Sequence, residues 1–537
     1  MKRIISVLAS TALLLGIFAA APAAVSATSF APASEVDHWV SKGGRLVSDG
    51  SGGYSCSRPG YRLIEDAAAQ AEPGEVIHIC RGTYFESDIE VDASVGLGIT
   101  IQGDGPNRTF IDARSDGRIF TTRGFTEEEL TEDAGDISDW ETPSIRVADM
   151  TLRGGDAQDG EDGANSFPGV DLVSAGGAVS SLGIVECNNV RFTGNYAGIG
   201  GAIYAGFGVR SERCTFANNK AMMGGAIASF GTVDDLGSTF SSNRAVGFGG
   251  AVWALPFFST AGVEMHSMDD STGLMTNSFT NSIFSKNAAG MGGGAVAIEE
   301  SCTEFDRSTF TKNSTAGAGG AVYMNEGSFS ATAQLLLFGY GVPGDFFSLL
   351  ESGFGEGFCD SQIINTKFES NSATLSYDAV NDLIGGWCEE EVGGCFTIDD
   401  VIGLESAGGA VAYFGGLDDT TGSAIDAAYD AGHNIEIGSG SIFRSNSAAN
   451  GGAIYADDAI IYTAGVDFYG NRARQVGPGG YGGYGSAVYL MDESVMAFSY
   501  EGSWEADTRH RATFELNTDP VHEEGDESWE FDLIALD

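Results

Sequence analysis

Residues 192–204 read FTGNYAGIGGAIY, residues 216–228 read FANNKAMMGGAIA, and residues 240–253 read FSSNRAVGFGGAVW. Each stretch joins a Phe-x-x-Asn motif to a Gly-Gly-Ala triplet that is followed by Ile or Val. The first motif recurs with the phenylalanines Phe192, Phe216, Phe240, Phe284, Phe310, Phe368, Phe443, Phe468 and Phe514. The triplet begins at Gly176, Gly200, Gly224, Gly249, Gly293, Gly319, Gly408 and Gly451, with a degenerate copy at Gly485. Copies without insertions recur every 24 to 26 residues.

This period predicts an all-β fold, a single-stranded right-handed parallel β-helix in which each repeat forms one coil of a three-sided solenoid. Glycine and asparagine tolerate positive φ at the turns, and asparagine side chains also cap neighbouring backbone groups. The motif phenylalanine is expected to point inward and to stack on its counterpart in the next coil, about 4.8 Å away. One coil cannot bury this face alone, so the stack of coils must supply the core.

The segments outside the repeats set the expected domain organisation. Residues 1–27 are expected to be a signal peptide, because Met1-Lys2-Arg3 precedes an apolar run and Val25-Ser26-Ala27 supplies small residues at the cleavage site. The further divisions are a leader segment 28–57, a capping helix with the first coils 58–120, an acidic insertion 121–144, coils with insertions 145–517, and an acidic tail 518–537. Longer gaps between motifs place insertions at 253–278, 327–357, 374–405 and 416–440.

The charge balance excludes one class of partner. The chain carries 27 basic and 75 acidic residues, a formal net charge of −48. Nucleic acid binding needs clustered Lys and Arg against the phosphates, so no nucleic acid partner is expected. No segment after the signal peptide has the roughly 18 apolar residues of a membrane span. We therefore expect a secreted, extracellular or cell-surface protein without a transmembrane segment in the mature chain, and its acidity makes Ca²⁺ the one candidate cofactor.

Eight cysteines, an even number in an exported chain, predict disulfides. The pairs expected from proximity along the chain are Cys56 with Cys80, Cys187 with Cys214, Cys302 with Cys359, and Cys388 with Cys395. Cys302 and Cys359 lie eight and nine residues before successive motif phenylalanines, which places them side by side on adjacent coils.

The two alternating motifs resemble the repeats of the chlamydial polymorphic outer-membrane protein family, in which Gly-Gly-Ala followed by Ile, Leu or Val alternates with Phe-x-x-Asn. The resemblance covers residues 174–517. Because members of this family are typically surface adhesins or antigens, it implies a β-helix that is displayed at a cell surface.

Residues 61–112 are similar to another group, the first coil of pectin-lyase-like β-helix proteins. They contain an expected capping helix over Leu63–Ala71, a Pro73-Gly74 turn and a strand over Val76–Cys80. Such a helix closes the open end of the apolar bore and hides edge backbone groups from water. Because this segment occurs in lyases, hydrolases and non-enzymes, the resemblance implies a fold rather than a reaction.

An outward aromatic strip is expected on the strands that follow the triplets. The fourth residue of each register is Val or Ile and must face the bore, so the next residue faces out, because strand side chains alternate. Most outward positions are aromatic, and the expected strip is Tyr204, Trp253, Tyr323, Tyr413, Tyr455 and Tyr489. Such a strip suits stacking against sugar rings or an extended polymer. The alternative is cross-strand packing without a ligand.

Carboxylates recur at the eighth position of the same register, at Glu300, Glu326, Asp458 and Asp492. Stacked coils place Glu300 about 5 Å from Glu326, and Asp458 equally close to Asp492. Carboxylates at this distance share a proton, hold a calcium ion or act as the pair of a retaining glycosidase. The alternative is a hydrated strand end.

A second acidic feature is the loop at residues 154–163, which reads GGDAQDGEDG. Its carboxylates can wrap Ca²⁺ with oxygen ligands, and the candidate ligands are Asp156, Asp159, Glu161 and Asp162. The loop matches neither the EF-hand nor the calcium-binding nonapeptide pattern, so a solvated loop is the alternative.

Three functions follow from these features. The first is an adhesin-like binding protein that contacts a polysaccharide, a cell-surface glycan or a protein through its loops and aromatic strip. The second is an extracellular polysaccharide lyase or glycoside hydrolase that uses the acidic pairs. The third is a structural envelope protein. The chain has neither a Gly-x-Ser-x-Gly nor a His-Glu-x-x-His motif, so no catalytic residue is assigned and the non-enzymatic functions are favoured.

Overall fold

The computed structural model divides the chain into two units, residues 1–35 and 36–537. It describes residues 37–48, 51–92, 98–122, 144–157, 166–167, 170–171, 174–255, 276–299, 301–325, 359–373, 406–414, 433–457, 459–474, 484–491, 495–498, 513–515 and 521–523. The predicted signal peptide lies outside these residues.

Three long parallel sheets dominate this unit, with 13, 12 and 12 strands. The first sheet contains β1 (Asp37–Val40), β4 (Val76–Ile79), β7 (Ile99–Gly103), β10 (Ser144–Ala148), β15 (Ile184–Asn188), β18 (Gly208–Glu212), β22 (Thr232–Leu236), β26 (Thr276–Thr280), β30 (Cys302–Asp306), β34 (Cys359–Ile364), β37 (His433–Ile437), β41 (Ile460–Thr463) and β45 (Val495–Phe498).

The second and third sheets follow the same order along the chain. The second sheet contains β5 (Gly82–Tyr84), β8 (Thr109–Asp112), β11 (Thr151–Arg153), β16 (Arg191–Thr193), β19 (Thr215–Ala217), β23 (Thr239–Ser241), β27 (Ile283–Ser285), β31 (Thr309–Thr311), β35 (Lys367–Glu369), β38 (Ile442–Arg444), β42 (Asp467–Tyr469) and β46 (Thr513–Glu515). The third contains β6 (Ile89–Val91), β9 (Phe120–Thr122), β14 (Val179–Ser181), β17 (Ile203–Ala205), β21 (Ile227–Ser229), β25 (Val252–Ala254), β29 (Val296–Glu299), β33 (Val322–Asn325), β36 (Val411–Phe414), β40 (Ile454–Asp457), β44 (Val488–Met491) and β47 (Val521–Glu523).

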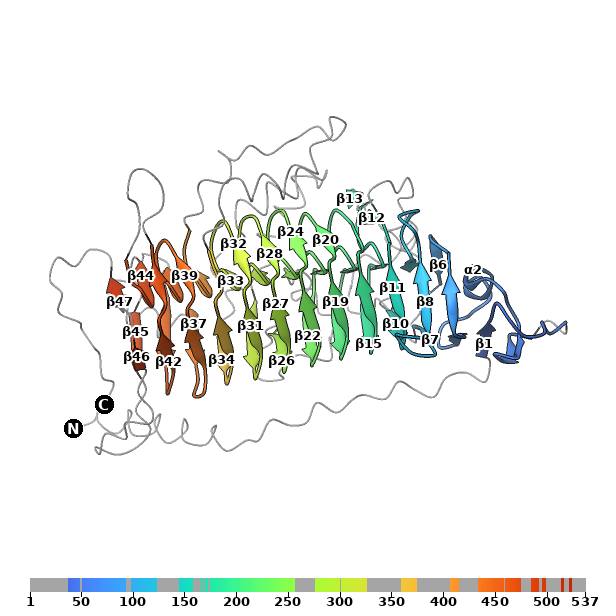
Figure 1. The fold of residues 1–537 in the computed structure, drawn as a ribbon. Coiled ribbons are helices and arrows are strands. Elements are labelled where there is room, and N and C mark those ends of the chain that lie inside the picture. The colour runs from blue at the N-terminus through green and yellow to red at the C-terminus, as the bar shows by residue number, and fades with distance from the viewer. Residues whose placement is uncertain are drawn as a thin grey trace, which may run out of the picture. The chain divides into compact units, whose positions relative to one another are not determined.

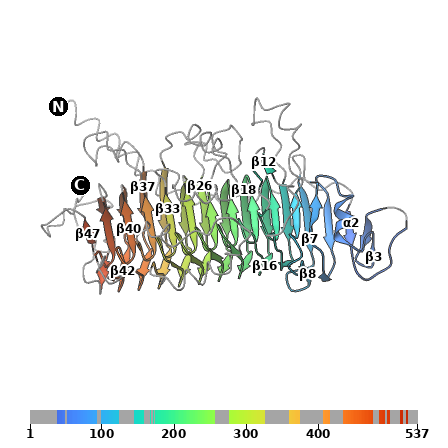
Figure 2. The same cartoon turned by 90° about the horizontal axis from the view of Figure 1, so that it is seen from above.

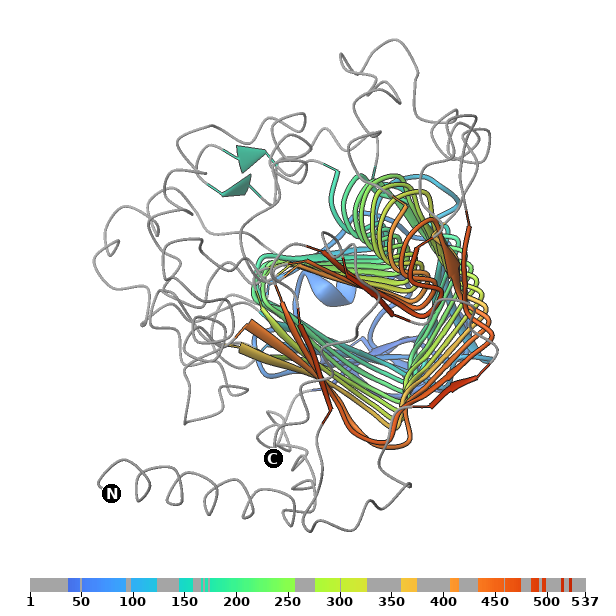
Figure 3. The same ribbon diagram turned by 90° about the vertical axis from the view of Figure 1, so that its left-hand side faces the viewer.

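Successive coils lie over one another in register. The chain runs from a first-sheet strand to a second-sheet strand and then to a third-sheet strand before the next coil begins, as Figure 1 and Figure 2 show. Seen along the stack, the three sheets surround a common bore (Figure 3). The predicted right-handed parallel β-helix is therefore confirmed.

The bore is filled by the two columns that the motifs predict. The aliphatic residue after each Gly-Gly-Ala triplet, such as Val252 or Val296, is completely buried in the main core. The motif phenylalanines from Phe192 to Phe468 stack with ring centroids 4.6–5.0 Å apart and nearly parallel planes. The predicted stacking distance is confirmed.

The motif asparagines form a buried hydrogen-bonded ladder. The Oδ1 atom of Asn287 accepts bonds of 3.0 Å from both the backbone N–H and the side-chain amide of Asn243. The amide of Asn287 donates in turn to Asn313 Oδ1 and to the carbonyl of Phe240, each at 3.0 Å. Positive φ falls instead on the residue before the asparagine, for example 58° at Lys286. The motif asparagine is therefore a ladder residue rather than the strained turn residue.

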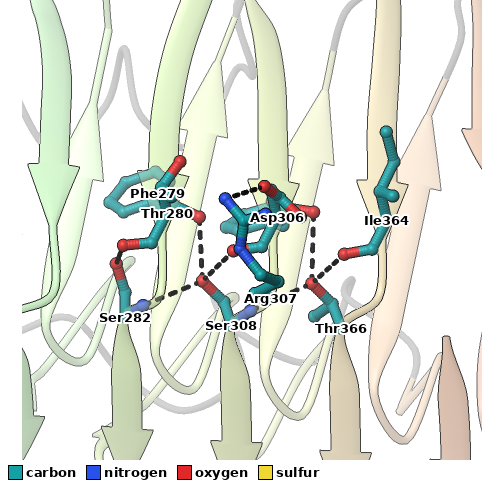
Figure 4. A network of polar contacts seen from close by, with 9 residues as sticks. Phe279, Thr280, Ser282, Asp306, Arg307, Ser308, Ile364 and Thr366 are labelled. Atoms are coloured by element: carbon teal, nitrogen blue, oxygen red, sulfur yellow. Dashed lines mark hydrogen bonds and ion pairs between the residues drawn. The ribbon is translucent and has the colours of Figure 1, made fainter. Parts of the chain in front are cut away.

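A row of hydroxyl side chains lies at the corner between the first and second sheets (Figure 4). Ser308 Oγ donates to the carbonyl of Phe279 at 2.8 Å and accepts from the backbone N–H of Ser282 at 3.1 Å. The backbone N–H of Ser308 donates to Thr366 Oγ1 at 3.3 Å, which continues the row into the next coil. These bonds satisfy backbone groups that the turn removes from the sheets.

An outer layer covers the third sheet. It is formed by the segments that join each Phe-x-x-Asn motif to the next triplet. Four of them pair as the sheet β20 (Lys220–Ala221), β24 (Arg244–Ala245), β28 (Ala288–Ala289) and β32 (Ser314–Thr315), and two as β39 (Ser447–Ala448) and β43 (Arg472–Ala473). Apolar residues of these segments, including Ile199, Met223 and Phe248, join a second hydrophobic cluster, which we call the outer core.

Short elements complete the described structure. Antiparallel pairs form between β2 (Gly53–Ser55) and β3 (Arg58–Pro59), and between β12 (Ser166–Phe167) and β13 (Val170–Asp171). Helix α2 (Ile64–Ala68) is shorter than the predicted Leu63–Ala71, and its residues Ile64, Ala67 and Ala68 are buried. It contacts β6, the first strand of the third sheet. Closure of the bore by this helix stays a prediction.

Candidate functional site

The predicted aromatic strip is not on the surface. Tyr204 and Trp253 are completely buried, and Tyr323, Tyr455 and Tyr489 are 3%, 4% and 6% exposed. All five rings belong to the outer core, beneath the segments that lead to the triplets. The alternation rule correctly sends these side chains away from the bore, but a second layer of chain lies over them. The expectation that they face solvent is therefore wrong.

Edge and face contacts between rings hold the outer core together. Phe230 lies edge-on to Tyr204 and at 74° to Trp253, with 5.8 Å between ring centroids in both cases. Farther along, the ring of Phe414 lies 5.3 Å from Tyr323 and 5.6 Å from Tyr455. Burial raises the pKa of the Tyr204 and Tyr323 hydroxyls above the ordinary value of tyrosine. These residues pack the scaffold, as the alternative interpretation proposed.

Tyr413 lies on the opposite side of its strand from the predicted strip. The triplet that begins at Gly408 makes Ala412 the outward residue, and Ala412 is the registered partner of Tyr323. Tyr413 is the next residue along β36, so it points into the bore and belongs to the main core. The outward column therefore holds an alanine at this coil.

Most of the predicted acidic sites lie outside the described residues, namely Glu300, Glu326, Asp458, Asp492, Asp159, Glu161 and Asp162. Asp156 is described and forms a parallel bridge with Tyr196. Among the described residues, no group of three or more His, Cys, Asp or Glu side chains could hold a metal ion. The acidic pairs and the calcium loop stay predictions.

The described cysteines agree with the expected pairing. Cys56 is bonded to Cys80 and Cys187 to Cys214, with Cα atoms 5.6 and 6.6 Å apart. Cys302 is also disulfide-bonded, and Cys359 begins the strand beside it in the first sheet. Its pairing with Cys359 stays a prediction, and Cys388 and Cys395 lie outside the described residues.

A charged column crosses the outer face of the first sheet. We use this name for Arg146, Glu186, Arg210 and Asp234, which are registered partners on four successive strands and alternate in charge. Arg210 Nη1 lies 3.4 Å from Glu186 Oε1, and these side chains are 36% and 18% exposed. The column therefore offers cations and carboxylates to a polar ligand in a fixed order.

Two carboxyls of the column have altered proton affinity. Burial raises the pKa of Asp234 to about 6, although Arg210 acts to lower it and Asp235 adds to the increase. Burial also raises the pKa of Glu186, against the attraction of Arg210 and Arg146. A carboxyl that titrates near neutral pH beside an arginine is a candidate for acid–base chemistry.

Sequence analysis missed this column, although a signal was present. Arg146 stands six residues before Leu152, and Glu186, Arg210 and Asp234 each stand six residues before a motif phenylalanine. Leu152 is the registered partner of the first of these phenylalanines. Counting backwards from the motif, rather than forwards from the triplet, would have aligned the column.

One corner of the β-helix carries four long connections between successive strands. In five coils the connection between a third-sheet strand and the next first-sheet strand is two residues long: 182–183, 206–207, 230–231, 300–301 and 458–459. In four other coils the connection at the same position is much longer: 123–143, 255–275, 326–358 and 415–432. We call this position the loop-bearing corner. It adjoins the first sheet, whose outer face carries the charged column.

Comparison with known proteins identifies the repeat. Residues 189–206, 307–325 and 440–457 match the model of the Chlamydia polymorphic membrane protein repeat. Each match begins at or just before a second-sheet strand and ends at or just after a third-sheet strand, so it includes the outer-layer segment between them. The predicted resemblance to these repeats is confirmed. No curated protein matches the sequence.

Two solved structures show a weak likeness. The A-module of mannuronan C-5 epimerase AlgE6 from Azotobacter vinelandii is 10% identical, with a TM-score of 0.28, over 86% of this chain and 92% of that one. The PL6 family alginate lyase AlyGC is 10% identical, with a TM-score of 0.25, over 81% and 72%. Likeness at this level carries no argument about reaction or substrate. In the part of the chain that the structure describes, no helix is long and apolar enough to cross a membrane.

Proposed function

We propose that this chain is a secreted or cell-surface binding protein of the adhesin type. Its β-helix is a rigid support that presents the loop-bearing corner to a polysaccharide, a cell-surface glycan or a protein. The observation that carries this proposal is that four long connections share one corner, while five other coils close that corner with two residues. Insertions on one face of a solenoid commonly form its binding face.

Two further observations support an extracellular role. The disulfides Cys56–Cys80 and Cys187–Cys214 suit a chain that folds in an oxidising compartment. The matched repeat belongs to a family described as polymorphic membrane proteins, which fits display at a cell surface. Burial of the aromatic strip moves the expected contact surface from the third sheet to the loop-bearing corner and the outer face of the first sheet.

The test shortens the corner without disturbing the coils. Replacing residues 256–275 with one glycine leaves Leu255-Gly, which copies the Leu182-Gly183 turn between β14 and β15; both leucines belong to the outer core. The control replaces 475–483 with one glycine. This makes the segment from Arg472 match the uninterrupted segment from Arg244 to Gly249 in length.

Both variants and the full chain are applied to a glycan array and to cultured cells, with circular dichroism as the check on folding. We expect the full chain and the control to bind, and the corner variant to lose most of that binding. Binding that survives removal of 256–275 and of the three other corner connections would contradict the proposal. A folded full chain that binds no glycan or cell surface would also contradict it and would favour a structural envelope role.

A polysaccharide lyase or hydrolase is the second candidate, and the charged column favours it. Arg210 can pair with a sugar carboxylate, and Asp234, with a pKa of about 6, can exchange a proton near neutral pH. The test is release of reducing ends from acidic polysaccharides with and without EDTA. Product that disappears in Asp234→Asn and Arg210→Gln, but persists in Glu212→Gln, would support this function. Loss of product in Glu300→Gln would implicate the predicted acidic pair instead, and no product from the full chain would exclude both.

A further inference from the structure

Residues 41–63, which we call the N-terminal knob, differ in charge from the rest of the chain. The knob contains Lys42, Arg45, Arg58 and Arg62 and one acidic residue, Asp49, whereas the whole chain has 27 basic and 75 acidic residues. It follows β1, the strand that begins the first sheet. The knob itself is therefore net positive on a strongly acidic protein.

Bonds hold the described residues of the knob, 41–48 and 51–63, in place. The disulfide between Cys56 and Cys80 ties it to the residue that follows β4. The guanidinium of Arg62 donates to the carbonyls of Ser41 at 2.7 Å and Gly44 at 2.8 Å. A fixed surface loses little conformational entropy when it binds a partner.

Four large apolar side chains are exposed on or beside the knob: Leu46 at 44%, Tyr54 at 55%, Leu63 at 44% and Phe85 at 48%. Cations accompany the two rings. The guanidinium of Arg58 lies 4.9 Å from the centroid of Tyr54. The ammonium of Lys42 and the guanidinium of Arg114 lie 5.0 and 3.4 Å from the centroid of Phe85.

Bonds of neighbouring residues link the parts of the chain that carry these side chains, which we together call the N-terminal patch. Phe85 is joined to Leu63 through the next residue, Glu86, whose carboxylate accepts the backbone N–H of Ile64 at 2.6 Å. A second bond links the segment of Leu46 to that of Tyr54: the backbone N–H of Arg45, which precedes Leu46, donates to the carbonyl of Ser57 at 2.9 Å. A patch with both apolar and cationic groups fits an acidic peptide that contains large apolar residues.

The chain contains a segment of that chemistry. Residues 524–537 read EGDESWEFDLIALD, with six acidic residues, no basic residue and the large apolar residues Trp529, Phe531, Leu533, Ile534 and Leu536. The segment lies outside the described residues and follows β47, the last strand of the third sheet. It therefore leaves the end of the stack opposite to the patch (Figure 1).

We propose that residues 524–537 of one copy dock on the N-terminal patch of a second copy, so that the chains associate head to tail. The 12 strands of the third sheet, from β6 near the patch to β47, extend over about 53 Å at about 4.8 Å per strand. The segment reaches at most about 48 Å when fully extended, so its apolar residues cannot together cover the patch of its own chain. The patch and the segment are different surfaces, so the contact is heterologous. A pair of chains therefore keeps one unoccupied patch and one unbound segment, to which further copies can add.

The first test uses a fluorescent peptide with the sequence of residues 524–537 and a chain that ends at Glu523. Fluorescence anisotropy should show saturable binding that weakens as salt is raised, because the patch and the peptide have opposite charge. Tyr54→Ser with Arg58→Glu should weaken binding by about tenfold or more, as loss of a binding hot spot does. The matched control is Tyr469→Ser with Arg444→Glu, a similar pair on the second sheet with 5.2 Å between the guanidinium and the ring. No binding, or equal loss in the control, would overturn the proposal.

The second test is sedimentation velocity of the full chain over a hundredfold range of concentration. The sedimentation coefficient should rise with concentration in the full chain and in the control variant. It should stay constant in the chain that ends at Glu523 and in the patch variant. A full chain that is monomeric throughout, or assembly that persists without residues 524–537, would overturn the proposal.

Discussion

Tyr323 on β33 faces Ala412 on the neighbouring strand β36, and this pairing of a large ring with an alanine recurs along the third sheet. The registered outward residues from β17 to β40 are Tyr204, Ala228, Trp253, Ala297, Tyr323, Ala412 and Tyr455. Neighbouring strands lie only about 4.8 Å apart, so a ring on every strand would leave little space between the rings for other side chains of the outer core. The alanines provide that space, and Phe230, which follows β21, and Phe414, at the end of β36, each contact two successive rings there.

Enlarging one of these alanines should therefore destabilise the protein. Ala297 is completely buried between the registered partners Trp253 and Tyr323. Ala297→Phe is expected to lower the free energy of unfolding by about 1–3 kcal/mol, because the added ring meets a filled space. Urea unfolding measures the loss. Ala217→Phe on the partly exposed face of the second sheet is the control, and an equal loss in both variants would contradict a packed outer layer.

The second glycine of each triplet is required by close approach of the coils. A Cβ on Gly250 would lie 2.2 Å from the carbonyl oxygen of Gly294 and 2.7 Å from backbone atoms of Ala288. Gly250→Ala is therefore expected to cost more than about 3 kcal/mol or to prevent folding, since backbone of two coils must move. Gly194 has φ +66° and open space around its Cβ position, so Gly194→Ala should cost about 1–2 kcal/mol from backbone strain alone. Similar unfolding midpoints for the two variants would refute this distinction.

Removing one rung of the asparagine ladder should leave several buried groups unpaired. In Asn287→Leu, the backbone N–H and amide of Asn243 lose their acceptor and the carbonyl of Phe240 loses a donor. Each buried unpaired group costs about 1–3 kcal/mol, so we expect a loss of about 3–5 kcal/mol in chemical unfolding. Asn188→Leu, at a partly exposed asparagine that bonds Glu212, is the control and should cost less than about 1 kcal/mol. A small effect at Asn287 would show that the ladder contributes little to stability.

The raised pKa of Asp234 predicts a pH dependence of stability. The folded protein holds this proton up to pH about 6, whereas the unfolded chain releases it near pH 4. The folded state therefore binds more protons in that window, so this stabilisation is present below pH 4 and is lost as pH rises through 6. Asp234→Asn should reduce the fall in unfolding free energy between pH 4 and 7 by up to about 2 kcal/mol. Burial also raises the pKa of Asp235, so a dependence of the same sign should remain. The exposed Asp116→Asn is the control, and identical pH profiles for all three proteins would contradict the assignment.

The inward side of the fold could be predicted because both motifs describe it. A phenylalanine and an aliphatic residue repeat at fixed spacing, and side chains at equivalent positions of stacked coils must contact one another. The same logic placed Tyr204 and Trp253 on the outer side of the third sheet, which is correct. Alternation along a strand specifies the side on which a residue lies, however, and not whether another layer covers it. That information was present in the apolar residues before the triplets, such as Ile199, Met223 and Phe248.

The candidate site was less predictable for a physical reason. First-sheet strands carry no recurring motif, because their outer side chains contribute little to the core that makes the repeats alike. The residue type at one outward position therefore changes from coil to coil, for example from Arg146 to Asp234. Only the register of these residues with Glu186 and Arg210 reveals the charged column. The motif asparagine was predicted as a capping or turn residue, and only the stacked coils show that its side chain forms a continuous ladder.

The double variant Tyr323→Ala with Tyr455→Ala tests the central claim most directly, because both rings lie in the outer core at 3% and 4% exposure. Its urea unfolding and its glycan-array binding should be measured together. A loss of roughly 5 kcal/mol or more is expected from two large buried cavities, with any binding retained by the fraction that remains folded. Unchanged stability together with lost binding would contradict the account and would restore these rings as a ligand-binding surface.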